Sequence, residues 1–333
     1  QNPYTLAVVP LNLSPRANAT TTARAQNGVF LNFAGDGIID TVYSPQNVVL
    51  TAPGSLLNAN DDNLINILGA TVVLDAVGSI GTAARALNVA AGLGGRITAS
   101  AGNEVNLFGP LGFRFVVGSA TAGGTIRLTA AGEAEIDGTV ETPGDIALSA
   151  GGRVLLTGLA DVHSVAGRID MFAPAIRMLT GAVTRADAGR VVVEATQGDA
   201  QVTGITSGSG DAAAVSVTAA GRILAGTADP RTDITAMTAG AGVFLSGALG
   251  VGDRTQANDT RLDDTVTDTP NPLRIRTGSI SAQSAQGDLR IAALVDSVLG
   301  SLQAPQGRII ATGAGRLTVT DSTSGGSQEI TAE

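Results

Sequence analysis

The stretch that decides the fold is Gly124-Thr125-Ile126-Arg127-Leu128-Thr129-Ala130, because the same pattern returns further along the chain. The later copies are Gly144-Asp145-Ile146-Ala147-Leu148-Ser149-Ala150, Gly167-Arg168-Ile169-Asp170-Met171 and Gly189-Arg190-Val191-Val192-Val193. Each copy begins with a glycine and a polar residue and continues with apolar residues at every second position. Strict alternation of this kind predicts a short β-strand with one buried face.

The first apolar residue of each copy can be followed as an anchor through most of the chain. The anchors are Val48, Val72, Ile97, Ile126, Ile146, Ile169, Val191, Val215, Ile234, Leu273, Leu289 and Ile309. Most of them lie 19 to 25 residues apart, and a second strand of the same pattern follows most anchors by 8 to 10 residues. A unit this small cannot bury its own apolar stripe, so copies must stack. The repeat predicts an all-β parallel solenoid of about twelve coils. A β-sandwich, which also has regularly spaced strands, needs no such period.

The period sets the expected boundaries. Residues 1–44 carry no clean anchor and are predicted to be an N-terminal cap or assembly segment. Residues 45–320 are predicted to form the solenoid, with an insertion near 247–272, and the small and polar residues 321–333 form a C-terminal tail. A shorter third side of the coil is expected at positions such as Val140, Val183 and Ile205. The inward pairs should include Ile126 with Leu128, Ile146 with Leu148, and Ile169 with Met171.

The composition agrees with a narrow interior. The 333 residues include 44 glycines, aromatic residues make up 3%, and hydrophobic residues make up 44%. There is no cysteine and no lysine, which excludes disulfides, thiolate nucleophiles and lysine Schiff bases. The net charge of −9 disfavours nucleic acid as a partner. No uninterrupted apolar stretch is long enough for a membrane-spanning helix.

Two regions resemble a known family. The first is residues 78–89, which begin Gly78-Ser79-Ile80-Gly81 and end at Val89. The second holds the segments Gly287-Asp288-Leu289-Arg290-Ile291 and Ala304-Pro305-Gln306-Gly307-Arg308-Ile309. Both are similar to coils of filamentous-haemagglutinin-type bacterial exoproteins. The resemblance covers most of residues 45–320. It implies a right-handed parallel β-helix in a large secreted adhesin.

Acidic residues cluster in the predicted insertion. Carboxylates are the ligands that Ca²⁺ takes, in sets of six to eight oxygens. The weak calcium candidates are Asp253, Asp259, Asp263, Asp264 and Asp268. Neither the EF-hand spacing nor the glycine-rich calcium nonapeptide is present, so a solvated loop is favoured and no cofactor is expected. The corner Asn60-Asp61-Asp62-Asn63 is interpreted in the same way.

Candidate catalytic residues are sparse. Asp161 and His163 alternate on one strand face, with Ser164 on the other, and we interpret the only histidine as a surface residue. A β-helix polysaccharide lyase or hydrolase would need carboxylates facing each other across a groove. The outward candidates for such a pair are Glu135, Asp137, Asp145 and Asp170. Tyr4 and Tyr43 are the only tyrosines and tryptophan is absent, so a sugar-stacking groove is not indicated.

We therefore expect a non-enzymatic, structural or adhesive β-solenoid that is secreted or displayed on the cell surface, in the manner of a bacterial adhesin, biofilm matrix or filament protein. The chain starts at Gln1 rather than at an initiator methionine, which favours a processed, exported protein. Its expected partner is either a second copy, joined end to end, or a surface or matrix receptor. The expected assembly residues are Tyr4, Leu6, Val8 and Ile330, in strand-like pieces near the two ends. The alternative function is that of a polysaccharide lyase or hydrolase.

Overall fold

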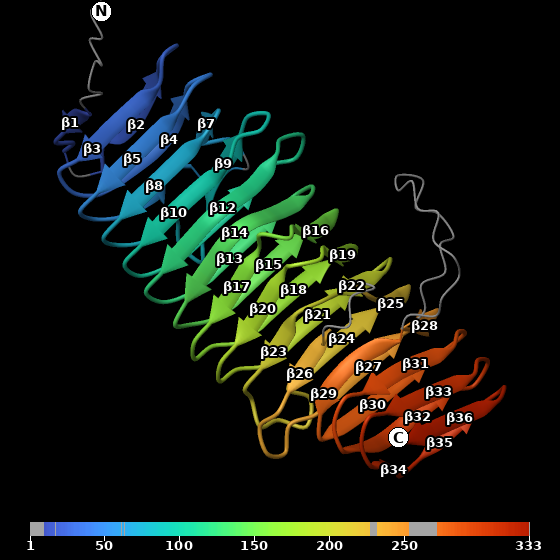
Figure 1. Ribbon diagram of the computed structural model, residues 1–333. Helices are drawn as coiled ribbons and strands as arrows, with labels where there is room; N and C mark the ends of the chain where they lie inside the picture. The colour runs from blue at the N-terminus through green and yellow to red at the C-terminus, as the bar shows by residue number, and fades with distance from the viewer. Residues whose placement is uncertain are drawn as a thin grey trace, which may run out of the picture. The chain divides into compact units, whose positions relative to one another are not determined.

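A computed structural model describes residues 10–16, 18–60, 62, 64–226, 232–252 and 272–332. The chain divides into two compact units, Gln1–Pro143 and Gly144–Glu333. Every regular element in the described residues is a β-strand, and the strands of each unit stack as successive coils of a solenoid (Figure 1). No helix of the described residues has the length and apolar character needed to cross a membrane.

The strands of unit 1 form two parallel sheets. The first sheet contains β1 (Leu11–Leu13), β3 (Val29–Phe33), β5 (Val48–Ala52), β8 (Val72–Ala76), β10 (Ile97–Ala101), β12 (Phe115–Ala122) and β14 (Ala134–Thr142). The second contains β2 (Thr20–Arg24), β4 (Gly37–Tyr43), β6 (Leu56–Asn58), β7 (Ile67–Gly69), β9 (Leu87–Ala91), β11 (Val105–Gly109) and β13 (Ile126–Ala130). In the first sheet Val48 lies between Val29 and Val72 in register, and Ile97 follows Val72. Identical positions therefore stack into an apolar ladder.

Unit 2 also contains strands of two parallel sheets, and in several of its coils the first sheet receives two short strands. Its first-sheet strands are β16 (Arg153–Leu156), β17 (Asp161–Ser164), β19 (Ala175–Met178), β20 (Val183–Ala186), β22 (Ala200–Val202), β23 (Ile205–Ser207), β25 (Arg222–Ala225), β26 (Ile234–Ala236), β28 (Gly250–Val251), β29 (Leu273–Thr277), β31 (Leu289–Ala293), β33 (Ile309–Gly313) and β36 (Gln328–Ala332). Its second-sheet strands are β15 (Ile146–Ala150), β18 (Ile169–Ala173), β21 (Val191–Ala195), β24 (Val215–Ala219), β27 (Val243–Gly247), β30 (Ser279–Ser284), β32 (Ser297–Ala304), β34 (Leu317–Val319) and β35 (Ser322–Ser324).

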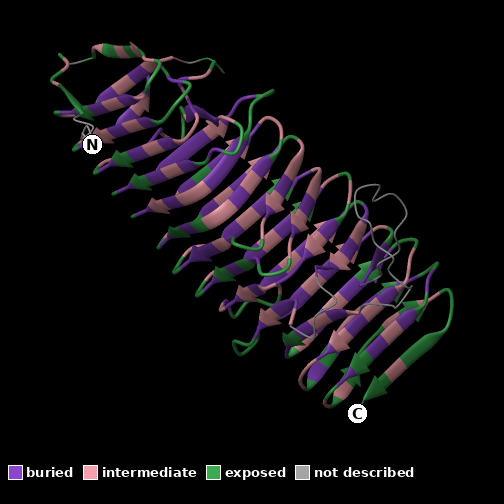
Figure 2. Cartoon of the chain, turned by 45° about the horizontal axis from the view of Figure 1, so that its top comes forward, coloured by how far each residue is buried: buried purple, intermediate pink, exposed green. Residues whose placement is uncertain are grey.

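The interior of each unit is made of stacked aliphatic side chains, and exposed positions gather at the corners (Figure 2). In unit 2, Ile169 lies between Ile146 and Val191 in register, and the ladder continues through Val215 and Val243. The three inward pairs that the repeat predicts are all buried. The parallel β-solenoid is therefore confirmed, while its handedness and its coil number stay predictions.

The anchor series joins two different sheets. Every anchor begins a strand and is buried, but Val48, Val72 and Ile97 lie on the first sheet, whereas Ile126 and the four anchors after it lie on the second. The series returns to the first sheet at Ile234. The changes of sheet fall at the gap of 29 residues after Ile97 and at the gap of 19 residues before Ile234. Both sheets obey the same alternation, so the sequence pattern cannot distinguish them.

The third side of the coil differs from the prediction at one position. Val140 and Ile205 are buried as expected, but Val183 points outward and is partly exposed. Thr184 lies opposite Ile205 in the ladder and is fully buried. The strand is shifted by one residue relative to the sequence interpretation, which exchanges its inner and outer faces.

Parallel pairing extends beyond residues 45–320 at both ends. Leu11 pairs with Leu31 near the start of unit 1, and β2 pairs with β4. In unit 2, β35 pairs with β32, and β36 pairs with β33 along its whole length. Residues 321–332, predicted to be a C-terminal tail with a strand-like piece at Ile330, contain two strands that pair with the solenoid. Their small and polar side chains do not prevent pairing, because the ladder bonds are made by the backbone.

Candidate functional site

Most of the residues proposed from the sequence for assembly or calcium lie outside the described residues. These are Tyr4, Leu6 and Val8 and the acidic residues Asp253, Asp259, Asp263, Asp264 and Asp268. Ile330 lies in β36, in register with Ala311 of β33, and is partly exposed. Among the described residues, no group of three or more His, Asp or Glu side chains has an arrangement that could hold a metal ion.

Two of the outward carboxylates of unit 1 contact arginine side chains from other coils, Glu135 one coil away and Asp137 two coils away. Arg96 Nε donates a hydrogen bond of 2.6 Å to Asp137 Oδ2, and Arg114 Nη2 lies 3.2 Å from Glu135 Oε2. Asp137 and Glu135 both belong to β14 and point outward. These carboxylates are therefore engaged within the solenoid itself.

In unit 2, the two outward carboxylates named from the sequence meet the same residue. Arg168 Nε lies 2.7 Å from Asp170 Oδ2, and the Arg168 backbone N–H donates to Asp145 Oδ1 at 2.9 Å. All four carboxylates considered for polysaccharide chemistry therefore bind an arginine side chain or a backbone N–H.

The Asp145 contact belongs to a repeated device. An aspartate just before a strand accepts a backbone N–H from the residue at the same corner of the next coil. The bonds run from Ser55 N to Asp36 at 2.7 Å, Arg168 N to Asp145 at 2.9 Å, Arg222 N to Asp199 at 2.7 Å, Arg274 N to Asp233 at 2.9 Å, Arg308 N to Asp288 at 2.8 Å and Arg316 N to Asp296 at 2.8 Å. These aspartates join one coil to the next at a corner where the sheet ladder is interrupted.

Asp288 and Asp233 show two environments for this device. Burial opposes ionisation of Asp288, but the hydrogen bonds and charge of Arg308, with the charge of Arg290, hold its pKa below the usual range. Asp233 is almost fully buried, and this desolvation raises its pKa to about 6 despite the hydrogen bond from Arg274. Asp233 therefore releases its proton at about pH 6.

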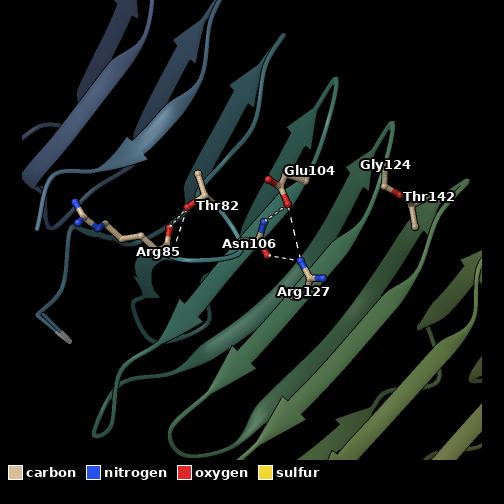
Figure 3. A network of polar contacts seen from close by, with 7 residues as sticks. All are labelled: Thr82, Arg85, Glu104, Asn106, Gly124, Arg127 and Thr142. Carbon is tan, nitrogen blue, oxygen red and sulfur yellow. Dashed lines mark hydrogen bonds and ion pairs between the residues drawn. The ribbon is translucent and has the colours of Figure 1, made fainter. Parts of the chain in front are cut away.

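Polar side chains of unit 1 also bond to one another, both within a coil and between coils. In Figure 3, Asn106 Nδ2 donates to Glu104 Oε2 at 2.9 Å, and Arg127 Nη1 donates to Asn106 Oδ1 at 3.4 Å. Asn60, in the corner considered for calcium, donates through Nδ2 to Asp40 Oδ1 at 2.7 Å. The Asn60 hydrogen bond, followed by one from Thr22, lowers the pKa of Asp40.

His163 is buried, so its interpretation as a surface residue is wrong. Arg185 and Asp187 of the next coil cover it: Arg185 Nη2 donates to His163 Nδ1 at 3.1 Å, and His163 Nε2 lies 2.9 Å from Asp187 Oδ2. Arg always donates, so Nδ1 is the acceptor and Nε2 carries the proton. Ser164 does point the other way, where its hydroxyl donates to Gly144 O at 2.7 Å.

The partner of His163 is Asp187 rather than Asp161. Asp161 Oδ1 is buried and has no hydrogen-bond partner, although it shares the strand with His163. In the sequence, Arg185 and Asp187 alternate 22 and 24 residues after His163, about one coil later. Coil spacing was the signal that could have found them.

Two hollows lie along one corner edge of unit 2. The larger, of about 660 Å³, has the loop 237–241 as one wall and three successive corners as its floor: Gly278 with Ser279, Val295 with Asp296, and Ala314 with Gly315. It arises because Gly278 alone separates β29 from β30, whereas the corresponding corner of the preceding coil, between β26 and β27, is a longer loop. We call this hollow the corner groove.

The smaller hollow, of about 350 Å³, lies on the other side of Met237 and Thr238, which line both hollows. Asp187, the partner of His163, lines it too. Asp296 is the only charged residue in the lining of the corner groove, and its Oδ1 already accepts the Arg316 N–H. Apart from Asp296, the corner groove therefore offers uncharged residues, which are mostly small and include Val295 and Met237.

Comparison with protein families, with characterised proteins and with solved structures finds no significant match to this chain.

Proposed function

We propose that this chain is a non-enzymatic β-solenoid that works outside the cell as a structural or adhesive element and assembles with copies of itself. The observation that carries the proposal is what the outward-pointing charged side chains bind. Arginine and carboxylate side chains bond from coil to coil, as Arg114 does with Glu135 and Arg308 with Asp288. These charged side chains on the outer surface hold the stack of coils together. The resemblance of several coils to filamentous-haemagglutinin-type exoproteins supports the same role and an exported location.

End-to-end assembly is supported by the edge strands of unit 2. Leu317 and Val319 of β34 lie in register with Ser297 and Leu299, and Ile330 of β36 follows Ala311. In the part of the chain that the structure describes, β34 pairs with β32 and β36 pairs with β33. An open ladder edge with partly exposed apolar side chains can accept a further strand. A second copy is the occupant we propose.

Electron microscopy and sedimentation over a concentration series test this assembly. The wild-type chain should form rods that lengthen with concentration. Ile330→Lys places a charge at the edge position and should shorten them, whereas Thr318→Lys, at an outward exposed position of β34, should not. A wild-type chain that stays monomeric at every concentration would overturn end-to-end assembly.

The alternative, a polysaccharide lyase or hydrolase, is distinguished by direct assay. Release of unsaturated products or reducing ends from acidic and neutral polysaccharides, lost on substitution of Glu135 or Asp170, would replace the structural proposal. Cell fractionation tests the exported location: recovery of the chain only from the cytosol would contradict it.

A further inference from the structure

Two corner loops of unit 1 present leucine in the same way. The sequences are Gly92-Leu93-Gly94-Gly95, after β9, and Pro110-Leu111-Gly112-Phe113, after β11. In each loop the fourth residue donates its N–H to the carbonyl of the first, at 3.1 Å and 3.4 Å. The third residue is a glycine with positive φ, 73° at Gly94 and 84° at Gly112. A positive φ at this position is the requirement of a type II turn.

The turns expose their apolar side chains. Leu93 is 94% exposed, Leu111 74% and Phe113 46%. A Cβ added at Gly94 or Gly112 would meet no heavy atom within 4 Å, so both turns stand clear of the solenoid. No residue of either turn is charged. We call the two turns together the leucine knob.

The knob is held by its base. Each turn is followed directly by an arginine, Arg96 or Arg114, and these two bind Asp137 and Glu135 of β14. The Ala91 N–H also donates to the Arg114 carbonyl at 3.2 Å, which joins the two loops on adjacent coils. β9 and β11 pair in parallel, so the strand ends from which the two loops project lie at the same edge of unit 1. The exposed leucines are thus a fixed feature of the surface.

The corner groove of unit 2 complements the knob. Its floor extends over three successive corners, about 14 Å at the spacing of parallel coils, and the knob is two coils thick, about 10 Å. Its lining is uncharged apart from Asp296, and Met237 is 54% exposed along its wall. The groove and the knob are both built on the coil repeat, so their spacings agree when two solenoids lie side by side.

We propose that the leucine knob of one copy docks in the corner groove of a second copy, with Leu93 and Leu111 against Met237, Ala241 and Val295. The contact is heterologous because knob and groove are different surfaces, and it is lateral because both lie at corners. It rests on the proposed self-assembling role and adds to it, since end-to-end contacts build filaments and this contact joins them side by side.

Crosslinking tests the docking directly. The natural chain has no cysteine, so a chain with Leu93→Cys can be mixed with a differently tagged chain with Met237→Cys and oxidised. The mixed disulfide dimer should form at least tenfold faster than with the control Leu64→Cys, whose side chain is 69% exposed at another corner of unit 1. Equal rates for Leu93→Cys and the control would overturn the docking.

Assembly provides a second readout. The double variant Leu93→Ser/Leu111→Ser should raise the concentration needed for lateral association at least tenfold and leave rod length unchanged, and Leu64→Ser should change neither. Rods that bundle normally in the double variant would overturn the docking and leave end-to-end assembly standing. Short single rods in wild type, with a positive crosslink, would support the docking and count against end-to-end growth. Leucine-dependent binding to phosphatidylcholine vesicles, without a crosslink to Met237→Cys, would assign the knob to a bilayer instead.

Discussion

Gly189 lies directly above Gly167 at one corner of unit 2, so close that a Cβ on Gly189 would lie 1.9 Å from the Gly167 carbonyl oxygen. Neither residue has a positive φ. Glycine is required here by the approach of one coil to the next, not by the local backbone conformation.

Gly189→Ala should therefore push two coils apart and lower the free energy of unfolding by about 3 kcal/mol. Gly278→Ala is the matched control, because a Cβ there meets nothing within 4 Å, and its effect should stay within about 0.5 kcal/mol. Urea unfolding followed by circular dichroism measures both. Equal effects for the two variants would contradict the close approach.

Ile146 is fully buried and in register with Ile169, so Ile146→Asp should place an unpaired charge in a narrow core. We expect a loss of about 4 kcal/mol or more, or failure of the surrounding coils to fold. Ile146→Val removes one methylene group and should cost about 1 kcal/mol. An unchanged unfolding midpoint in Ile146→Asp would exclude the ladder.

Thr184→Val should stabilise unit 2. The Thr184 hydroxyl is buried among ladder residues and has no hydrogen-bond partner, so replacing it with a methyl group should raise the unfolding free energy by about 1 kcal/mol. Thr142→Val is the comparison, because the Thr142 hydroxyl donates to the Gly124 carbonyl (Figure 3), and the same change should destabilise by about 1 kcal/mol. Thermal unfolding distinguishes the two signs. Destabilisation by Thr184→Val would indicate a partner for its hydroxyl.

Asp233 should make unit 2 less stable as pH rises towards neutrality. Burial raises its pKa from 3.8 to about 6, so the folded chain keeps a proton that the unfolded chain releases. Between these two pH values the free energy of unfolding falls by about 3 kcal/mol in total, and above them it is constant. Asp233→Asn keeps an oxygen acceptor for the Arg274 N–H and removes the titration. The stability of this variant relative to wild type should rise from pH 4 to pH 7, and a pH-independent difference would contradict the raised pKa.

The alternation in the sequence was sufficient to predict parallel coils, the anchor residues and the buried pairs such as Ile126 with Leu128. These are local properties, because a strand with one buried face shows its period in a few residues. The candidate sites were harder to predict from the sequence, which indicated His163 but paired it with Asp161 on its own strand.

What only the tertiary structure decided is how one coil lies on the next. The register between coils assigned each anchor to one of two sheets that share the same alternation, exchanged Val183 for Thr184 in the ladder, and placed Asp187 over His163. It also brought the turns of Leu93 and Leu111 to one edge, and it set the single-residue corner at Gly278 beside a longer loop to form the groove. Such relations join residues about 20 or more positions apart. They depend on the length of each corner, which the period-two pattern of the strands does not encode.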